Sequence, residues 1–174
     1  MKLNNNKGSS IAIIVLSTAL IVFVLFPVFA AIIERYIIAD KVEIIKDAID
    51  IANISTYMAI DKNNMGKDTI TLQDETVNSI YRSMLAKNLN LDNNLNPNSS
   101  SVSDGAVIIK SLEIYTSGFP LTCPDGTIIT RPSVHAYITV PLKPSLYRQI
   151  ILQILGKQYV ELIIHLDTEI PVNN

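Results

Sequence analysis

Hydrophobic residues are distributed very unevenly along the 174-residue chain, and this divides it into two parts. No charged residue occurs between Gly8 and Ile33, and nearly every residue in that run is apolar. As an α-helix the run would be about 39 Å long, more than the roughly 30 Å hydrocarbon core of a bilayer. We therefore predict a transmembrane helix over 9–33, bent at Pro27 because proline lacks an N–H.

A cleaved secretory signal is the alternative explanation of the same run. Lys2 and Lys7 form a basic segment before it, and Val28-Phe29-Ala30 matches a small-residue cleavage site. The apolar run is longer than a usual signal core, and it continues beyond Ala30 without a break. Retention of the helix as a membrane anchor is therefore the preferred interpretation.

The charges that flank the run predict its orientation. The leader, residues 1–8, carries only positive charge, and a segment of this kind is readily kept in the cytoplasm. Arg35, Lys41 and Lys46 follow the run, but a large folded segment can be translocated regardless of its charge. We expect a single-pass protein of the cell membrane, with its N-terminus in the cytoplasm and residues 34–174 outside.

Beyond Ile33 the hydrophobic pattern becomes one-sided. Apolar residues spaced by three and four positions predict an amphipathic helix, and they are Ile38, Val42, Ile45, Ile49 and Ala52. The opposite face carries Asp40, Glu43, Asp47 and Asp50. No Gly or Pro separates this segment from the apolar run, so one helix is expected from about Ser9 to about Ile60. Its stripe can pack against the chain's own domain, against further copies of the helix, or against both.

A second, shorter helix is expected after a break at Asn63–Gly66. Thr71 and Asp74 have the spacing of a capping box, and the helix should end near Asn88. Its predicted buried residues are Val77, Ile80, Met84 and Leu85. The Asn- and Ser-rich stretch that follows is predicted to bury no face and to form a mobile loop over about 92–105.

Period-two alternation marks the C-terminal part as strand-rich. Three strands are predicted, over 108–116, 127–140 with an interruption at Pro132, and 158–170. A short apolar helix is expected at 144–155, with Gly156 as its C-terminal cap. The predicted fold class is α+β, in which helices pack on a three- or four-stranded, mainly antiparallel sheet.

Charge and cysteine content exclude several classes of partner. The net charge is −2, and no segment combines Lys and Arg with aromatic residues, so nucleic acid is not an expected partner. Cys123 is the sole cysteine, which excludes an intrachain disulfide. Heavy use of Ile, Asn and Lys is typical of an AT-rich bacterial genome.

No motif that fixes a cofactor occurs, and we predict no catalytic, cofactor or metal site. Cys123, His135 and Asp167 have the residue types of a nucleophile, a base and an orienting acid, but most chains of this length contain such a trio. His135 and His165 fall on outward strand faces and could share a metal, although solvated surface histidines are far more usual.

The N-terminal region resembles pilin-like proteins. Lys7-Gly8-Ser9-Ser10 leads directly into the apolar helix, which is followed by Glu34-Arg35-Tyr36 and the amphipathic region around Asp47-Ala48. The closest resemblance is to the TadE/TadG-like pseudopilins of the Tad (Flp) pilus system, and it covers about the first 60 residues. It implies cleavage of the leader after Gly8, with Ser9 as the mature N-terminus.

That resemblance implies a structural or assembly component of a Tad-like type IV pilus or secretion system. The expected partners are membrane lipid and other subunits of the system, including copies of this chain, bound by helix packing. Pilins carry Glu at the fifth mature position, where this chain has Ile13, so an uncleaved, static anchor is a second possibility. An anchored extracytoplasmic binding or sensor domain is the alternative function.

Overall fold

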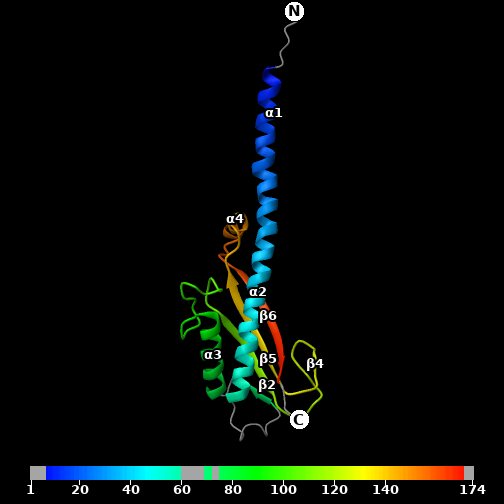
Figure 1. Ribbon diagram of the computed structural model, residues 1–174, viewed down its shortest axis with the longest axis vertical. Coiled ribbons are helices and arrows are strands. Elements are labelled where there is room, and N and C mark those ends of the chain that lie inside the picture. The colour runs from blue at the N-terminus through cyan, green and yellow to red at the C-terminus, as the bar shows by residue number, and fades with distance from the viewer. Residues whose placement is uncertain (1–6, 60–68, 72–74, 171–174) are drawn as a thin grey trace, which may run out of the picture.

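A single long helix organises the structure (Figure 1). The computed structural model describes residues 7–59, 69–71 and 75–170. The helix comprises α1 (Lys7–Leu20), a π-helical turn η1 (Ile21–Leu25) and α2 (Phe26–Ala59), which follow one another without a gap. It is long and apolar enough to cross a membrane, and none of its most apolar window is buried. The domain surrounds only its C-terminal half, so the predicted α+β class with a protruding helix is confirmed.

The helix is irregular where its sequence contains proline. Pro27 has no N–H to donate to the carbonyl of Phe23 one turn back. Immediately before it, the N–H of Phe26 donates to the Ile21 carbonyl five residues away, which is π-helical geometry. The irregularity predicted at Pro27 is therefore a single π-helical turn, Ile21–Leu25, in the apolar half of the helix.

The outer half of α2 supplies one side of the hydrophobic core. Ile45, Ile49 and Ala52 of the predicted stripe are buried within the domain, whereas Ile38 and Val42 are half-buried. Much of this stripe therefore packs within the chain itself. Asp50, expected on the polar face, is half-buried because its Oδ1 accepts a 2.7 Å hydrogen bond from the Thr168 hydroxyl.

The sheet has four strands in the order β1-β2-β5-β6, and every neighbouring pair is antiparallel. These strands are β1 (Thr69–Thr71), β2 (Ile108–Tyr115), β5 (Ser133–Leu142) and β6 (Val160–Glu169). The even-numbered side chains of β5, such as Val134 and Ile138, are buried on the α2 side. A separate hairpin of β3 (Leu121–Thr122) and β4 (Ile128–Ile129) has a small core of its own, in which Tyr115, Cys123 and Ile129 are buried.

The second helix is α3 (Glu75–Leu89), which packs beside α2. The predicted capping role of Thr71 is wrong, because Thr71 ends strand β1 and pairs with Glu113, four residues before α3 begins. Its proposed partner Asp74 and the predicted break at Asn63–Gly66 lie outside the described residues.

The loop after α3 buries more than its composition predicted. The expectation that it buries no face is wrong for Leu95 and Ser103, which are 2% and 3% exposed. Asp92 orders the first part, because its Oδ1 accepts hydrogen bonds of 2.8 Å from the N–H groups of Asn94 and Asn96. These local hydrogen bonds from the backbone to the Asp92 side chain stabilise a compact loop. The polar composition of the segment does not predict them.

A short apolar helix, α4 (Leu146–Ile154), follows β5. Its N-cap is Ser145, so Pro144 lies just before the helix rather than in its first turn. At the other end Gly156 has a φ of 70°, and the Lys157 N–H donates to the Leu152 carbonyl at 2.8 Å. This is a Schellman cap, which confirms the predicted role of Gly156.

Candidate functional site

The hairpin β3–β4 brings two polar side chains over the outer face of the sheet. Its turn is Cys123-Pro-Asp-Gly, closed by a 2.9 Å hydrogen bond from the Gly126 N–H to the Cys123 carbonyl. Gly126 has a φ of 91°, a conformation that other residues rarely adopt. The tight turn holds the side chains of Cys123 and Asp125 close together, and the Cys123 thiol donates to Asp125 Oδ1.

Strand register supplies two more polar side chains beneath this turn. His135 of β5 lies directly opposite Asp167 of β6 in the antiparallel ladder. Because both occupy odd-numbered positions, their side chains leave the sheet on the face away from α2. The ring Nδ1 of His135 is 2.7 Å from Asp167 Oδ1.

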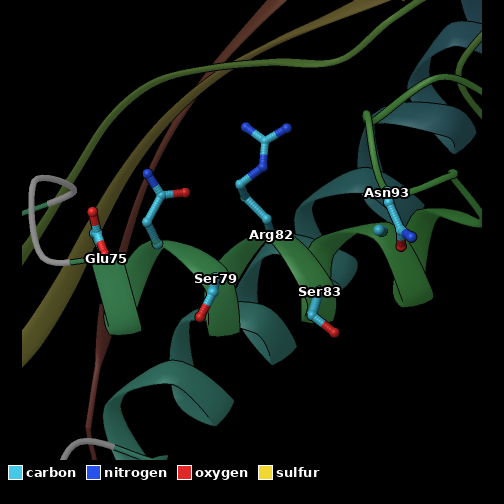
Figure 2. Close-up of a pocket in the computed structure, with 7 residues that line it drawn as sticks. Glu75, Ser79, Arg82, Ser83 and Asn93 are labelled. Carbon is cyan, nitrogen blue, oxygen red and sulfur yellow. The ribbon is translucent and has the colours of Figure 1, made fainter.

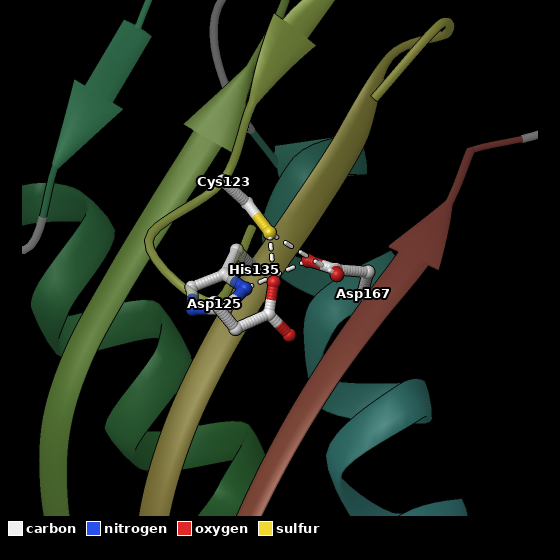
Figure 3. A group of neighbouring side chains, drawn as sticks. All are labelled: Cys123, Asp125, His135 and Asp167. Atoms are coloured by element: carbon white, nitrogen blue, oxygen red, sulfur yellow. Dashed lines mark hydrogen bonds and ion pairs between the residues drawn. The ribbon is translucent and has the colours of Figure 1, made fainter. Parts of the chain in front are cut away.

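The four residues form one compact group, which we call the distal cluster: Cys123, Asp125, His135 and Asp167 (Figure 3). One nitrogen, sulfur or carboxylate oxygen from each lies within 4.8 Å of the corresponding atoms of the others. Cys123 Sγ is 3.6 Å from Asp167 Oδ2, so the thiol lies between two carboxylates. The cluster is at the end of the domain remote from α1 (Figure 1).

Burial and hydrogen bonding set the protonation of the cluster. Burial, followed by the hydrogen bond to Asp125, raises the pKa of the Cys123 thiol. The same thiol contact, with help from the Thr127 N–H, lowers the pKa of Asp125 to about 2. At neutral pH the isolated cluster therefore contains a protonated thiol and an ionised Asp125 carboxylate.

These protonation states argue against nucleophilic catalysis by Cys123. The structure does bring Cys123, His135 and Asp167 together, as a catalytic trio would require. A nucleophilic cysteine is usually activated by a lowered pKa or by an adjacent general base. Here the thiol donates to carboxylates, which disfavour the thiolate.

The ligand types in the distal cluster are those of a transition-metal site. Thiolate, imidazole and carboxylate are the three side-chain ligands that Zn²⁺ uses. His165, which the sequence suggested only as a possible metal partner of His135, is not part of this set: the ring centroids of the two histidines are 6.0 Å apart, and His165 stacks on Tyr137 at 4.0 Å. The expectation of a solvated His135 is wrong: the side chain is buried, with 1% exposure.

A second polar contact lies at the opposite end of the domain, between the long helix and α4. Glu34 is the first charged residue after the apolar run, and it is buried. It accepts a hydrogen bond from the Ser145 hydroxyl and one of 3.3 Å from Arg148 Nη1. These contacts fix the start of α4 against the long helix.

The helix α4 presents an apolar surface to its surroundings. We call the exposed side chains the α4 face: Leu146, Ile150, Ile151, Ile154 and Leu155. Ile151 and Arg148 line a groove together with Pro27 and Ala31, which belong to the charge-free run. The α4 face is therefore continuous with the exposed apolar surface of the long helix, and Figure 1 shows α4 at the end of the domain nearest α1.

A polar groove of about 390 Å³ on α3 has no comparable organisation. The side chains labelled in Figure 2 are spread along the helix and the neighbouring loop instead of converging on one point. Its two charged residues, Glu75 and Arg82, are about two helical turns apart. This arrangement does not assemble a catalytic group.

Sequence reasoning placed neither Asp125 in a site nor Glu34 in a contact. A signal for Asp125 was its position two residues from the sole cysteine. No sequence signal joins Glu34 to Ser145 and Arg148, because more than a hundred residues separate them.

Taken together, the fold is that of a small α+β domain built on the outer half of a helix able to cross a membrane. No protein-family model matches the chain, and comparisons with curated proteins and with solved structures give no match.

Proposed function

We propose that the protein is a membrane-anchored, pseudopilin-like structural or assembly component of a Tad-like pilus or secretion system. One observation carries the proposal: the apolar half of the long helix is unburied, whereas the other half of the same helix forms part of the domain core. A helix divided in this way joins a membrane or filament interior to a surface domain without a flexible linker.

The unburied half has the properties of a surface for helix packing. Its exposed side chains are nearly all aliphatic or aromatic, and Leu16 and Phe23 are among the most exposed. In the bilayer such side chains contact lipid, and in an assembly they contact the same helix of neighbouring subunits. Either environment removes from water an apolar surface far larger than monomeric soluble proteins expose.

The α4 face supports the membrane part of the proposal. Glu34 lies at the boundary of the charge-free run, and the groove beside it reaches back to Pro27 and Ala31. With the span in the bilayer, α4 would lie at the outer interface, with its apolar side chains in the acyl region and Arg148 near the headgroups. The proposed orientation, with the N-terminus cytoplasmic and the domain outside, rests on the positively charged leader.

An anchored binding or sensor domain is the second candidate. The distal cluster favours it, because four polar groups converge at the part of the domain farthest from the proposed membrane. Neither function requires catalysis, and we propose that the protein is not an enzyme.

Co-purification from the native host tests the leading proposal. The full-length protein, solubilised from membranes after mild cross-linking, should retain other pilus or secretion-system subunits or further copies of itself. A matched variant, Phe23→Asp, should lose these partners while its domain remains folded, because Phe23 lies in the unburied half. Recovery of a monomer alone, with cross-linking of a known complex as control, would favour the static anchor.

Intact mass of the same sample tests leader processing. A chain that begins at Ser9 supports a pseudopilin processed after Gly8. A chain that retains Lys2 and Lys7 supports an uncleaved anchor, and a chain that begins at Ala31 identifies a secretory signal.

A further inference from the structure

The distal cluster has an excess of negatively charged groups. Asp125 and Asp167 bring two carboxylates to within hydrogen-bonding reach of one thiol, and the neighbouring imidazole of His135 supplies at most one positive charge. Glu34, in contrast, is buried and contacts the half-exposed, permanently charged Arg148 and a serine hydroxyl. Asp125 is exposed and Asp167 is half-buried, but both carboxylates lie close to the same buried thiol, and like charges so close together favour a bound cation or proton.

We propose that the distal cluster is a binding site for a divalent transition-metal ion of the zinc class. The ligands are Cys123 Sγ, an imidazole nitrogen of His135 and one carboxylate oxygen each from Asp125 and Asp167. The proposal does not rest on the role in a pilus, because it uses only residues of the domain.

The separations within the cluster fit such an ion. With bonds of about 2.0–2.3 Å, the ligands of a tetrahedral zinc site are roughly 3.3–3.8 Å apart. Cys123 Sγ and Asp167 Oδ2 are 3.6 Å apart, and all four ligand atoms lie within 4.8 Å of one another. Two pairs of ligands are closer than this because they are hydrogen-bonded to each other: Cys123 Sγ with Asp125 Oδ1, and His135 Nδ1 with Asp167 Oδ1 at 2.7 Å. The atoms of each pair must move apart by about an ångström or more as the ion enters.

Metal binding also satisfies the proton balance of the site. The thiol of Cys123 loses its proton to solvent as the sulfur–metal bond forms. If Nδ1 of His135 is the ligand, the ring proton resides on Nε2. Two carboxylates and one thiolate then offset the two positive charges of the ion, which leaves the loaded site with a net charge of −1.

The four ligands come from two separate parts of the structure, so the ion has a structural role. Cys123 and Asp125 belong to the β3–β4 hairpin, whereas His135 and Asp167 belong to the main sheet. Each strand of the hairpin has only two residues, and isolated hairpins are marginally stable even when longer. The ion would fasten the hairpin to the outer face of β5 and β6, in a domain that has no disulfide.

Cobalt provides the direct test, because its absorption reports thiolate ligation. Full-length protein in detergent, purified without a polyhistidine tag and stripped with a chelator, should bind one Co²⁺ per chain. The spectrum should show a sulfur-to-cobalt charge-transfer band, and Zn²⁺ should displace it. Absence of this band when Co²⁺ is in excess over folded protein would overturn the proposal.

Variants identify the ligands. Cys123→Ala should abolish the charge-transfer band, and Asp167→Asn should weaken Zn²⁺ binding at least about tenfold. Two controls on the same face of β6, Glu161→Gln and His165→Gln, should bind as the wild type does, because neither residue belongs to the cluster. Wild-type affinity in Asp167→Asn, or loss of the metal in His165→Gln, would contradict the assigned ligand set.

Discussion

The two ends of the domain hold their acidic groups in different ways. At the end near α1, Glu34 lies between two helices and is matched by Arg148 and Ser145 within an otherwise apolar surface. At the far end, the carboxylates of Asp125 and Asp167 surround a thiol and share one imidazole. The buried carboxylate of the first contact is paired with an arginine of the chain, whereas the second group has two solvent-accessible carboxylates and can accept an added cation.

This difference indicates what each end contacts. A matched ion pair flanked by exposed Leu and Ile side chains suits the boundary between lipid and water. A cluster that combines a thiol, an imidazole and two carboxylates has the ligand types that bind a transition-metal ion. The domain therefore has an apolar end that faces the proposed membrane and a polar end that faces away from it (Figure 1).

The largest expected effect is on the core that joins the two ends. Ile49→Ala should lower the free energy of unfolding by about 2–5 kcal/mol, because Ile49 is fully buried in the hydrophobic core of the domain. Ile51→Ala is the matched control, since Ile51 is 52% exposed on the same helix and should change stability little. Equal losses in denaturant titrations of the two variants would contradict the described packing.

The next effect concerns the apolar end and its helix. Leu20→Arg places a charge near the middle of the charge-free run, where insertion should become less favourable by about 2.5–3.5 kcal/mol. Alkaline carbonate extraction should release much more of this variant than of wild type or Leu20→Phe. An unchanged membrane fraction would show that this part of the helix is not in the hydrocarbon core.

Removal of metal should affect only the polar end. Chelation should accelerate hydrogen exchange of the hairpin amides, including those of Cys123 and Gly126, by at least about tenfold. Exchange within α2 and α3 should remain unchanged, because these helices do not contribute to the cluster. Two results would contradict the proposed distinction between the ends. One is faster exchange throughout the domain after chelation, and the other is unchanged exchange of the hairpin in protein shown to contain metal.

The smallest expected effect is that of the matched ion pair. Arg148→Gln should cost no more than about 1 kcal/mol, because the Arg148 side chain is 50% exposed and its contact with Glu34 is solvent-screened. Thermal unfolding in detergent measures the change. A loss of several kcal/mol would contradict a solvent-screened contact between Arg148 and Glu34.

Periodicity predicted the main elements well. In a helix or strand with one buried face, the spacing of apolar residues in the local sequence indicates the type of element. The predicted strand over 108–116 corresponds to β2, and the strand over 158–170 corresponds to β6. Strand β1 was not predicted because three residues are too few to show alternation. The loop at 92–105 was misjudged because its burial depends on contacts made by single residues, such as Leu95, within a polar stretch.

The distal cluster could be predicted only in part. The types and outward positions of His135 and Asp167 follow from the strand pattern, but their direct opposition depends on the register between β5 and β6. His135 is buried beside the hairpin residues Cys123 and Asp125, and no local pattern encodes that packing. Three of the four cluster residues were identified from sequence as a possible set, although for a different chemistry.

Cysteine cross-linking in native membranes tests the central claim most directly. In a Cys123→Ala background, single cysteines placed in turn at positions 13–20 of the unburied half would be treated with a short bifunctional maleimide. A subunit that assembles through this helix should give dimers and higher species at positions recurring every three to four residues. Monomer at every position, with labelling confirmed at each, would contradict assembly by helix packing.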